Sequence, residues 1–317
     1  KGFAYVSEGD VYFRVAKSNN YAKLANKTLE DLEIGASGRT DAETERKENP
    51  LDFALWKAAK EGEVSWDSPW GPGRPGWHIE CSVMATEILG DTIDIHGGGA
   101  DLEFPHHTNE IAQSEAKTGK TFANYWMHNG FVNVDNEKMS KSLGNFVTVH
   151  DMLQTVDGQV LRFFLATQQY RKPINFTEKA IHDAEVNLKY LKNTHSLPLT
   201  EQVNQAELQT YLDAFQEAMD DDFNTANGVT VLFDMAKWIN SGNYDQTVKD
   251  AFEKMLQVFG IVFEEEVLDE DIEKLIEERQ AARANKDFAT ADRIRDELAA
   301  QGIKLLDTKE GVRWTRD

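Results

Sequence analysis

The chain has 317 residues, which is enough for two or three compact domains rather than one. Its 40% hydrophobic and 28% charged residues are typical of a globular protein and exclude a disordered or fibrous one. The net charge of −21 argues against a protein that coats nucleic acid non-specifically, although a local basic patch remains compatible with a phosphate contact.

Cellular location is constrained by what the sequence lacks. It has no apolar run long enough to cross a bilayer and no signal-peptide pattern, and its single cysteine, Cys81, excludes an internal disulfide. We therefore expect a cytoplasmic protein without a membrane partner. The first residue is Lys1 rather than Met, so we expect the natural start to lie upstream.

Residues 1–70 are predicted to form a small module that contains a β-hairpin. The segments 4–6 and 11–15 alternate apolar and polar side chains, and a charged stretch over 38–49 is predicted as an exposed loop. The Gly- and Pro-rich segment 66–77 is predicted as a constrained loop, because proline interrupts both helices and strand pairing.

A βα unit of a parallel sheet is predicted next. A helix is expected from Trp77 to a stop at Gly90, followed by a short apolar strand over 92–95. The strand is expected to close with a glycine turn at 97–99, and a second helix to start near Pro105, a residue favoured in the first helical turn. Strand, glycine turn and helix in this order indicate a parallel α/β sheet.

From residue 148 onward the pattern changes to long helices, with apolar residues at helical spacing. A further helical stretch over 271–300 is interrupted only softly near Asp287, and residues 302–317 alternate around Gly311 as a small hairpin would. The chain is thus predicted to be an α/β segment followed by a helical domain and a compact end-piece.

One candidate metal site involves Cys81, His106, His107 and Glu110. His106 and Glu110 lie four apart on the second predicted helix, so their side chains share a face. A thiolate, an imidazole and a carboxylate form an acceptable zinc set. Spacing alone leaves two alternatives open: His107, three residues from Glu110, shares that face too, and a lone cysteine is more often a small buried apolar residue.

Two further segments suggest nucleotide chemistry. Glycines 97–99 would let a ligand approach the backbone closely, and Asp101 is placed to bond a ribose hydroxyl, although a tight turn is the simpler alternative. Lys138 and Lys141 flank Met-Ser in a Ser- and Gly-rich loop and are candidate cations for a triphosphate, with a solvated surface loop as the alternative.

The order of these segments resembles one enzyme family. The resemblance rests on GWHIECSVMATEILG (76–90), DIHGGGADLEFPHHTNEIAQSEA (94–116) and KMSKSLGNF (138–146), and it extends to AMDDDFNTANG (218–228) and to the end from 277 to 316. The KMSKS string is similar to a signature of class I aminoacyl-tRNA synthetases, and the other two strings resemble the cysteinyl-tRNA synthetases in particular.

The resemblance implies a fold and a set of domains. It implies an α/β fold: the second half of a Rossmann-type catalytic domain with an insertion module, then a helical-bundle anticodon-binding domain and a small α+β C-terminal piece. The implied ranges are 1–70 for the insertion module, 71–147 for the catalytic half with the KMSKS loop, 148–176 for a stem-contact segment, 177–265 for the helical bundle and 266–317 for the anticodon-recognition piece.

The resemblance also implies zinc ligands at Cys81, His106 and Glu110, one Zn²⁺ per chain, and so selects His106 over His107. In this family the zinc binds the thiol of the substrate cysteine, and a soft thiolate ligand separates cysteine from serine better than an apolar pocket does. Trp77 and His96 are implied to line the cysteine pocket.

Further implied roles concern ATP and tRNA. Gly98, Asp101, Lys138 and Lys141 are implied to bind ATP, with Mg²⁺, while the lysines act in the formation of cysteinyl-adenylate and its transfer to tRNA(Cys). The residues implied to contact the anticodon are Arg283, Phe288, Asp292 and Asp307. We expect the protein to be a monomer.

The chain departs from the family pattern at two points. It contains no HIGH-like string and no second cysteine as a fourth zinc ligand, both of which belong to the first half of the family's nucleotide-binding fold. We therefore expect it to start within the insertion between the two halves. Two rival functions stay open: a related ligase that joins cysteine to an amino sugar, which would not need the helical and C-terminal domains, and a non-catalytic tRNA-binding module.

Overall fold

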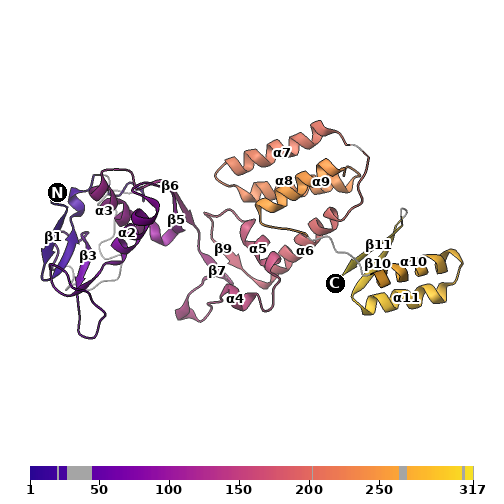
Figure 1. The fold of residues 1–317 in the computed structure, drawn as a ribbon, viewed down its shortest axis with the longest axis horizontal. Helices are drawn as coiled ribbons and strands as arrows, with labels where there is room; N and C mark the ends of the chain where they lie inside the picture. Colours follow the sequence, from indigo (N-terminus) through magenta and orange to yellow (C-terminus); the bar gives the residue numbers. More distant parts are fainter. Residues whose placement is uncertain (20, 27–44, 202, 264–269, 309–310, 317) are drawn as a thin grey trace. The chain divides into compact units, whose positions relative to one another are not determined.

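The computed structural model describes residues 1–19, 21–26, 45–201, 203–263, 270–308 and 311–316 (Figure 1). The chain divides into two compact units, Lys1–Ile261 and Val262–Asp317. Within the described ranges, no helix combines the length and the apolar character needed to cross a membrane.

The first unit begins with an antiparallel sheet in the order β1-β2-β3-β4. Its strands are β1 (Ala4–Ser7), β2 (Asp10–Phe13), β3 (Phe53–Ala58) and β4 (Gly73–Pro75). The predicted hairpin is confirmed, since β1 pairs with β2 around a turn in which Gly9 has φ +88°. Of the predicted loop over 38–49, residues 38–44 lie outside the described residues.

The segment 66–77 is not entirely the loop that the sequence predicts, because it contains β4. Trp66 forms a bridge with Gly73, and β4 pairs with β3. Proline is tolerated in this strand because β4 is at the edge of the sheet, where an N–H donor is not needed on the open side. The sheet packs through Phe13 and Phe53 against Ala112 of the following α/β layer.

The predicted parallel pairing is confirmed by β5 (Ile93–Gly99) and β6 (Ala123–Asn129). The helix α2 (Trp77–Leu89) ends at Gly90 as expected, and α3 (Thr108–Thr118) follows a π-helical turn, Glu103–His107. A small core of Ile93, Phe122 and Ala123 holds this layer together.

The expected glycine turn at 97–99 is wrong, because these residues continue strand β5 and pair with Met127, His128 and Asn129. Glycine is needed there for space rather than for turning. A Cβ on Gly98 would lie 3.0 Å from His107 Cε1 and 2.8 Å from Leu102 Cδ1. The glycine therefore lets a histidine ring pack directly on the strand.

A small sheet in the order β8-β7-β9 follows, formed by β7 (Val132–Val134), β8 (Glu137–Lys138) and β9 (Ile174–Phe176). The predicted change to helices is confirmed. The helices that follow α3 in the first unit are α4 (Val149–Met152), α5 (Gly158–Ala166), α6 (Glu178–His195), α7 (Gln205–Asp220), α8 (Thr225–Asn240) and α9 (Gln246–Val258). Helices α7, α8 and α9 pack on one another, and α8 and α9 also contact α6.

The second unit consists of α10 (Glu270–Ala284), α11 (Phe288–Ala300), β10 (Ile303–Thr308) and β11 (Gly311–Arg316). The expected interruption near Asp287 is the N-cap of α11, where the Asp287 carboxylate accepts a hydrogen bond from the backbone N–H of Thr290. The expected terminal hairpin is confirmed by the antiparallel pairing of β10 with β11. Ile272, Ile294, Leu298 and Ile303 form the core of the unit.

Candidate metal and substrate site

Three potential metal ligands meet where α2 packs against α3. Cys81 projects from α2, His106 from the turn before α3, and Glu110 from the first turn of α3. Their Sγ, ring nitrogen and carboxylate oxygen all lie within 4.8 Å of one another. His106 and Glu110 share a helix face as their spacing predicts, with 3.5 Å between Nε2 and Oε2.

Two observations support the fit of a zinc ion to Cys81, His106 and Glu110. Zinc binds S, N and O donors at about 2.0–2.3 Å, so its ligand atoms must lie about 3–4 Å apart, a separation that the three donors approach. Glu110 is fully buried, and its Oε1 has no hydrogen-bond partner among the described residues. An ion in this position would satisfy that oxygen, and three protein ligands would leave a coordination position open.

A second group of donors shares Glu110. His96, His107 and Glu110 also have ligand atoms within 4.8 Å of one another, and His96 Nε2 lies 3.0 Å from Glu110 Oε2. His107 is 3.9 Å from the same oxygen through Nε2 and bonds His128 through Nδ1 at 2.8 Å. The geometry thus brings together both histidines that the sequence spacing allows.

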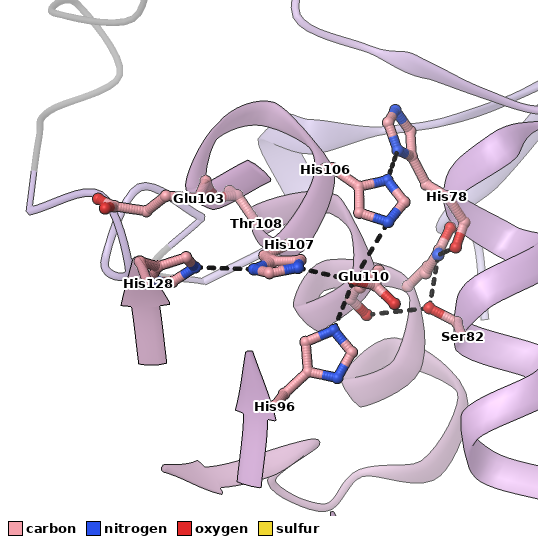
Figure 2. A network of polar contacts seen from close by, with 10 residues as sticks. His78, Ser82, His96, Glu103, His106, His107, Thr108, Glu110 and His128 are labelled. Atoms are coloured by element: carbon pink, nitrogen blue, oxygen red, sulfur yellow. Dashed lines mark hydrogen bonds and ion pairs between the residues drawn. The ribbon is translucent and has the colours of Figure 1, made fainter. Parts of the chain in front are cut away.

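His78 fixes the orientation of His106, as Figure 2 shows. The two Nδ1 atoms are 2.7 Å apart, which directs Nε2 of His106 toward Glu110. Gln113 in turn donates to the backbone carbonyl of His78 and to Ser82 Oγ. Sequence reasoning missed His78, although it lies three residues before Cys81 on the same helix face.

Burial shapes the protonation of this cluster. It lowers the pKa of His106, and together with the neighbouring His96, His128 and His106 it lowers the pKa of His107 to about 3. Both imidazoles are therefore neutral near pH 7 and keep a lone pair for a metal or a hydrogen-bond donor. Burial, followed by the carboxylates of Glu110 and Glu80, raises the pKa of Cys81.

The two residues expected at the cysteine pocket both contact the candidate ligands. The Trp77 ring stacks on the His106 ring with centroids 4.2 Å apart, and 55% of Trp77 is exposed. His96 lies in β5 and reaches Glu110 from the side opposite to His106 (Figure 2). An aromatic wall and a polar side chain thus border the donor set.

The expected ATP-binding residues lie on β5 and beyond it. Gly98 is in the strand and Asp101 is an exposed residue of the 3-10 turn that follows. Lys138 is in β8, with its Nζ 4.0 Å from the centroid of Phe131, and Lys141 begins the next 3-10 turn. Both lysines are exposed and accessible to a ligand.

The expected anticodon residues are spread over the second unit. Arg283 at the end of α10 forms an ion pair with Asp307 of β10. Phe288 opens α11 and is 62% exposed, whereas Asp292 pairs with Arg295 on the same helix at 3.1 Å. The structure thus joins Arg283 to Asp307, and within the described residues no ion pair or ring contact links Phe288 or Asp292 to that pair.

Comparison with known sequence families gives three matches along the chain. Residues 1–186 match the family described as the tRNA synthetases class I (C) catalytic domain, residues 214–264 match the DALR domain, and residues 265–314 match the cysteinyl-tRNA ligase anticodon binding domain. Solved structures agree on the fold: Mycobacterium tuberculosis methionyl-tRNA synthetase with methionyl-adenylate aligns at TM-score 0.50 and 15% identity over 79% of this chain and 57% of that one. The fold and the matched domains define a class I aminoacyl-tRNA synthetase, as the resemblance implied.

Curated relatives narrow the assignment. The chain is 96% identical to a cysteine–tRNA ligase of Streptococcus thermophilus and 84% identical to one of Streptococcus pyogenes, in each case over all of this chain and 71% of the relative. The chain therefore belongs to the cysteine–tRNA ligase family of tRNA-binding ligases. This membership argues against the amino-sugar ligase that the sequence left open.

Proposed function

We propose that the chain carries the cysteine-selecting site of a cysteine–tRNA ligase, which activates cysteine with ATP and transfers it to tRNA(Cys). The observation that supports this most directly is the convergence of Cys81, His106 and Glu110 within 4.8 Å, next to the exposed ring of Trp77. Cys81, His106 and Glu110 would hold one zinc ion. When bound, zinc supplies a soft Lewis acid for which a thiolate is a far better ligand than a hydroxyl.

The protein's own residues would do the remaining work. Trp77 stacks on His106 and so closes one side of the pocket, while His96, anchored at Glu110, presents its ring at the other. Selection by the metal ligand matters because apolar pockets separate near-isosteres such as serine and cysteine by only about 10²-fold.

Nucleotide chemistry would fall to Gly98, Asp101, Lys138 and Lys141. The strand glycine permits close approach of the backbone, and Asp101 would accept a hydrogen bond from a ribose hydroxyl. The exposed ammonium groups of Lys138 and Lys141 would bind the phosphates, with Mg²⁺, and stabilise the charge that develops as pyrophosphate leaves. The terminal ribose hydroxyl of tRNA(Cys) would then take the cysteinyl group from the adenylate, with AMP as the leaving group.

The test is cysteine-dependent ATP–pyrophosphate exchange by the full-length ligase, with serine as the control amino acid and zinc content measured by atomic absorption. Cys81→Ala is expected to abolish cysteine-specific exchange and to lower zinc content, whereas Val83→Ala, an exposed change on the same helix, should leave both unchanged. Exchange that persists in zinc-free Cys81→Ala would overturn the proposal. No exchange from a folded, zinc-loaded wild-type protein would favour a non-catalytic tRNA-binding module.

A further inference from the structure

The second unit contains a buried arginine that the proposed function does not use. Arg279 lies on α10, is 5% exposed, and donates from Nη1 and Nη2 to the two carboxylate oxygens of Asp307, each at 3.0 Å. Its Nε is buried and has no hydrogen-bond partner among the described residues. A buried arginine is uncommon unless it is paired, so this one has a specific task in the fold.

Arg283 and Asp307 complete a triad with Arg279. Arg283 lies one helical turn after Arg279, on the same face of α10, and also contacts Asp307. The side chains differ sharply in exposure: 7% for Arg279, against 44% for Arg283 and 41% for Asp307. Only Arg283 and Asp307 are therefore accessible to a ligand, and Arg279 supports them from behind.

We propose that Arg279 is a positioning residue for anticodon recognition: it fixes the Asp307 carboxylate so that Asp307 and Arg283 together meet one anticodon base. This inference rests on the proposed function as a tRNA(Cys) ligase and on the anticodon contact that the family resemblance implies for Arg283 and Asp307. Arg279 never touches the tRNA.

The hydrogen-bonding capacity of the carboxylate and the guanidinium groups supports these separate roles of Arg279 and Arg283. A carboxylate has about four acceptor positions, and a guanidinium has five N–H donors. Arg279 occupies one position on each oxygen and Arg283 one more on Oδ1, so Oδ2 keeps a free acceptor position and Arg283 keeps free donors. A fixed acceptor beside a fixed donor matches the edge of a nucleobase.

Electrostatics point the same way. An isolated carboxylate would repel the phosphates of tRNA, but two guanidinium groups around Asp307 leave this triad with net positive charge. Two guanidinium groups on one carboxylate supply local positive charge, which an acidic protein needs in order to contact RNA.

The simpler alternative is that Arg279 only ties the terminal hairpin to α10. The Arg279→Lys variant distinguishes a positioning role from a purely structural one. It keeps the positive charge but loses the planar guanidinium that holds both oxygens of Asp307. Arg279→Met removes the charge while filling much of the same space, and serves if the lysine variant unfolds. Arg293→Lys is the matched control, because Arg293 is a 63% exposed partner of Glu297 on α11.

The experiment measures kcat/KM of the full-length ligase for tRNA(Cys) and for tRNA(Cys) with each anticodon base replaced in turn, with pyrophosphate exchange as the tRNA-free readout. Arg279→Lys is expected to leave exchange within twofold of wild type. It should raise KM for tRNA(Cys) about 10- to 100-fold and reduce discrimination at one anticodon position, the position also affected by Asp307→Asn. The double variant should be no worse than the worse single variant.

Three results would overturn the inference. If folded Arg279→Lys or Arg279→Met discriminated between anticodons as well as wild type does, Arg279 would be a structural residue only. The same conclusion would follow if kcat/KM fell equally for every anticodon. No effect of Asp307→Asn on discrimination would remove the proposed anticodon contact itself, which distinguishes failure of the underlying proposal from failure of this one.

Discussion

Replacement of Glu110 by glutamine is expected to change metal affinity and metal-free stability in opposite directions. The Glu110 carboxylate has no exposed surface and faces His96, His106 and His107, and the lowered pKa values of His106 and His107 keep these two neutral near pH 7. Without a cation, a buried carboxylate loses hydration worth several kcal/mol. A buried glutamine costs only about 1–3 kcal/mol.

Glu110→Gln should therefore stabilise the metal-free protein by about 1–3 kcal/mol, which raises the Tm of a domain of this size by about 2–4 °C per kcal/mol. Glu110→Gln should lower zinc affinity by more than about 100-fold. Loss of a residue that only hydrogen-bonds to a zinc ligand typically costs about 10- to 100-fold, and here a charged ligand itself is removed. A 100-fold loss corresponds to about 2.8 kcal/mol, at about 1.4 kcal/mol for each factor of ten.

The assays are zinc titration against a competing chelator and thermal unfolding in the presence and absence of EDTA. The control is Glu87→Gln on α2, whose side chain is 71% exposed and should contribute within about 0.5 kcal/mol. A metal-free Glu110→Gln protein that melts below wild type, or one that binds zinc within threefold of wild type, would refute this account of the site.

Other expectations concern the nucleotide and tRNA contacts. Lys141→Ala should reduce pyrophosphate exchange about 10²- to 10³-fold, since an exposed ammonium group is proposed to stabilise the departing phosphates; unchanged exchange contradicts that role. Phe288→Ala should weaken tRNA(Cys) binding by about 1–3 kcal/mol in a filter-binding assay, with little change in Tm because the ring is 62% exposed; equal binding argues against stacking. Hydrogen bonds from Arg279 lower the pKa of Asp307, so their contribution to stability should be complete above about pH 4 and decline as pH falls further, as measured by circular dichroism of wild type against Asp307→Asn.

The sequence predicted elements whose signal is local. Helix α2 stops at Gly90, the hairpins at both ends of the chain pair as expected, and β5 lies parallel to β6. The sheet β8-β7-β9 was not predicted, because strands of two or three residues are too short to show a periodic pattern. The glycines at 97–99 looked like a turn because their strand partners, about 30 residues further on, leave no local trace.

The candidate site shows the same limit at the level of side chains. Residue type and spacing suggested Cys81 and Glu110 with either His106 or His107, and the family resemblance selected His106. The fold brings the donor atoms of Cys81, His106 and Glu110 together. The bond between His78 and His106 escaped prediction because it joins two elements whose packing no spacing rule specifies.

In the second unit an exposed arginine shares its carboxylate partner with a buried arginine. Arg279 and Arg283 have the same residue type and lie on one face of α10, so a helical wheel gives them the same role. The hairpin β10–β11 distinguishes them, because its Asp307 pairs with both and leaves one guanidinium buried and the other half-exposed. From the sequence, a recognition role can be assigned to a residue type at a given spacing. Only tertiary packing decides which residue contacts the ligand and which residue orients it.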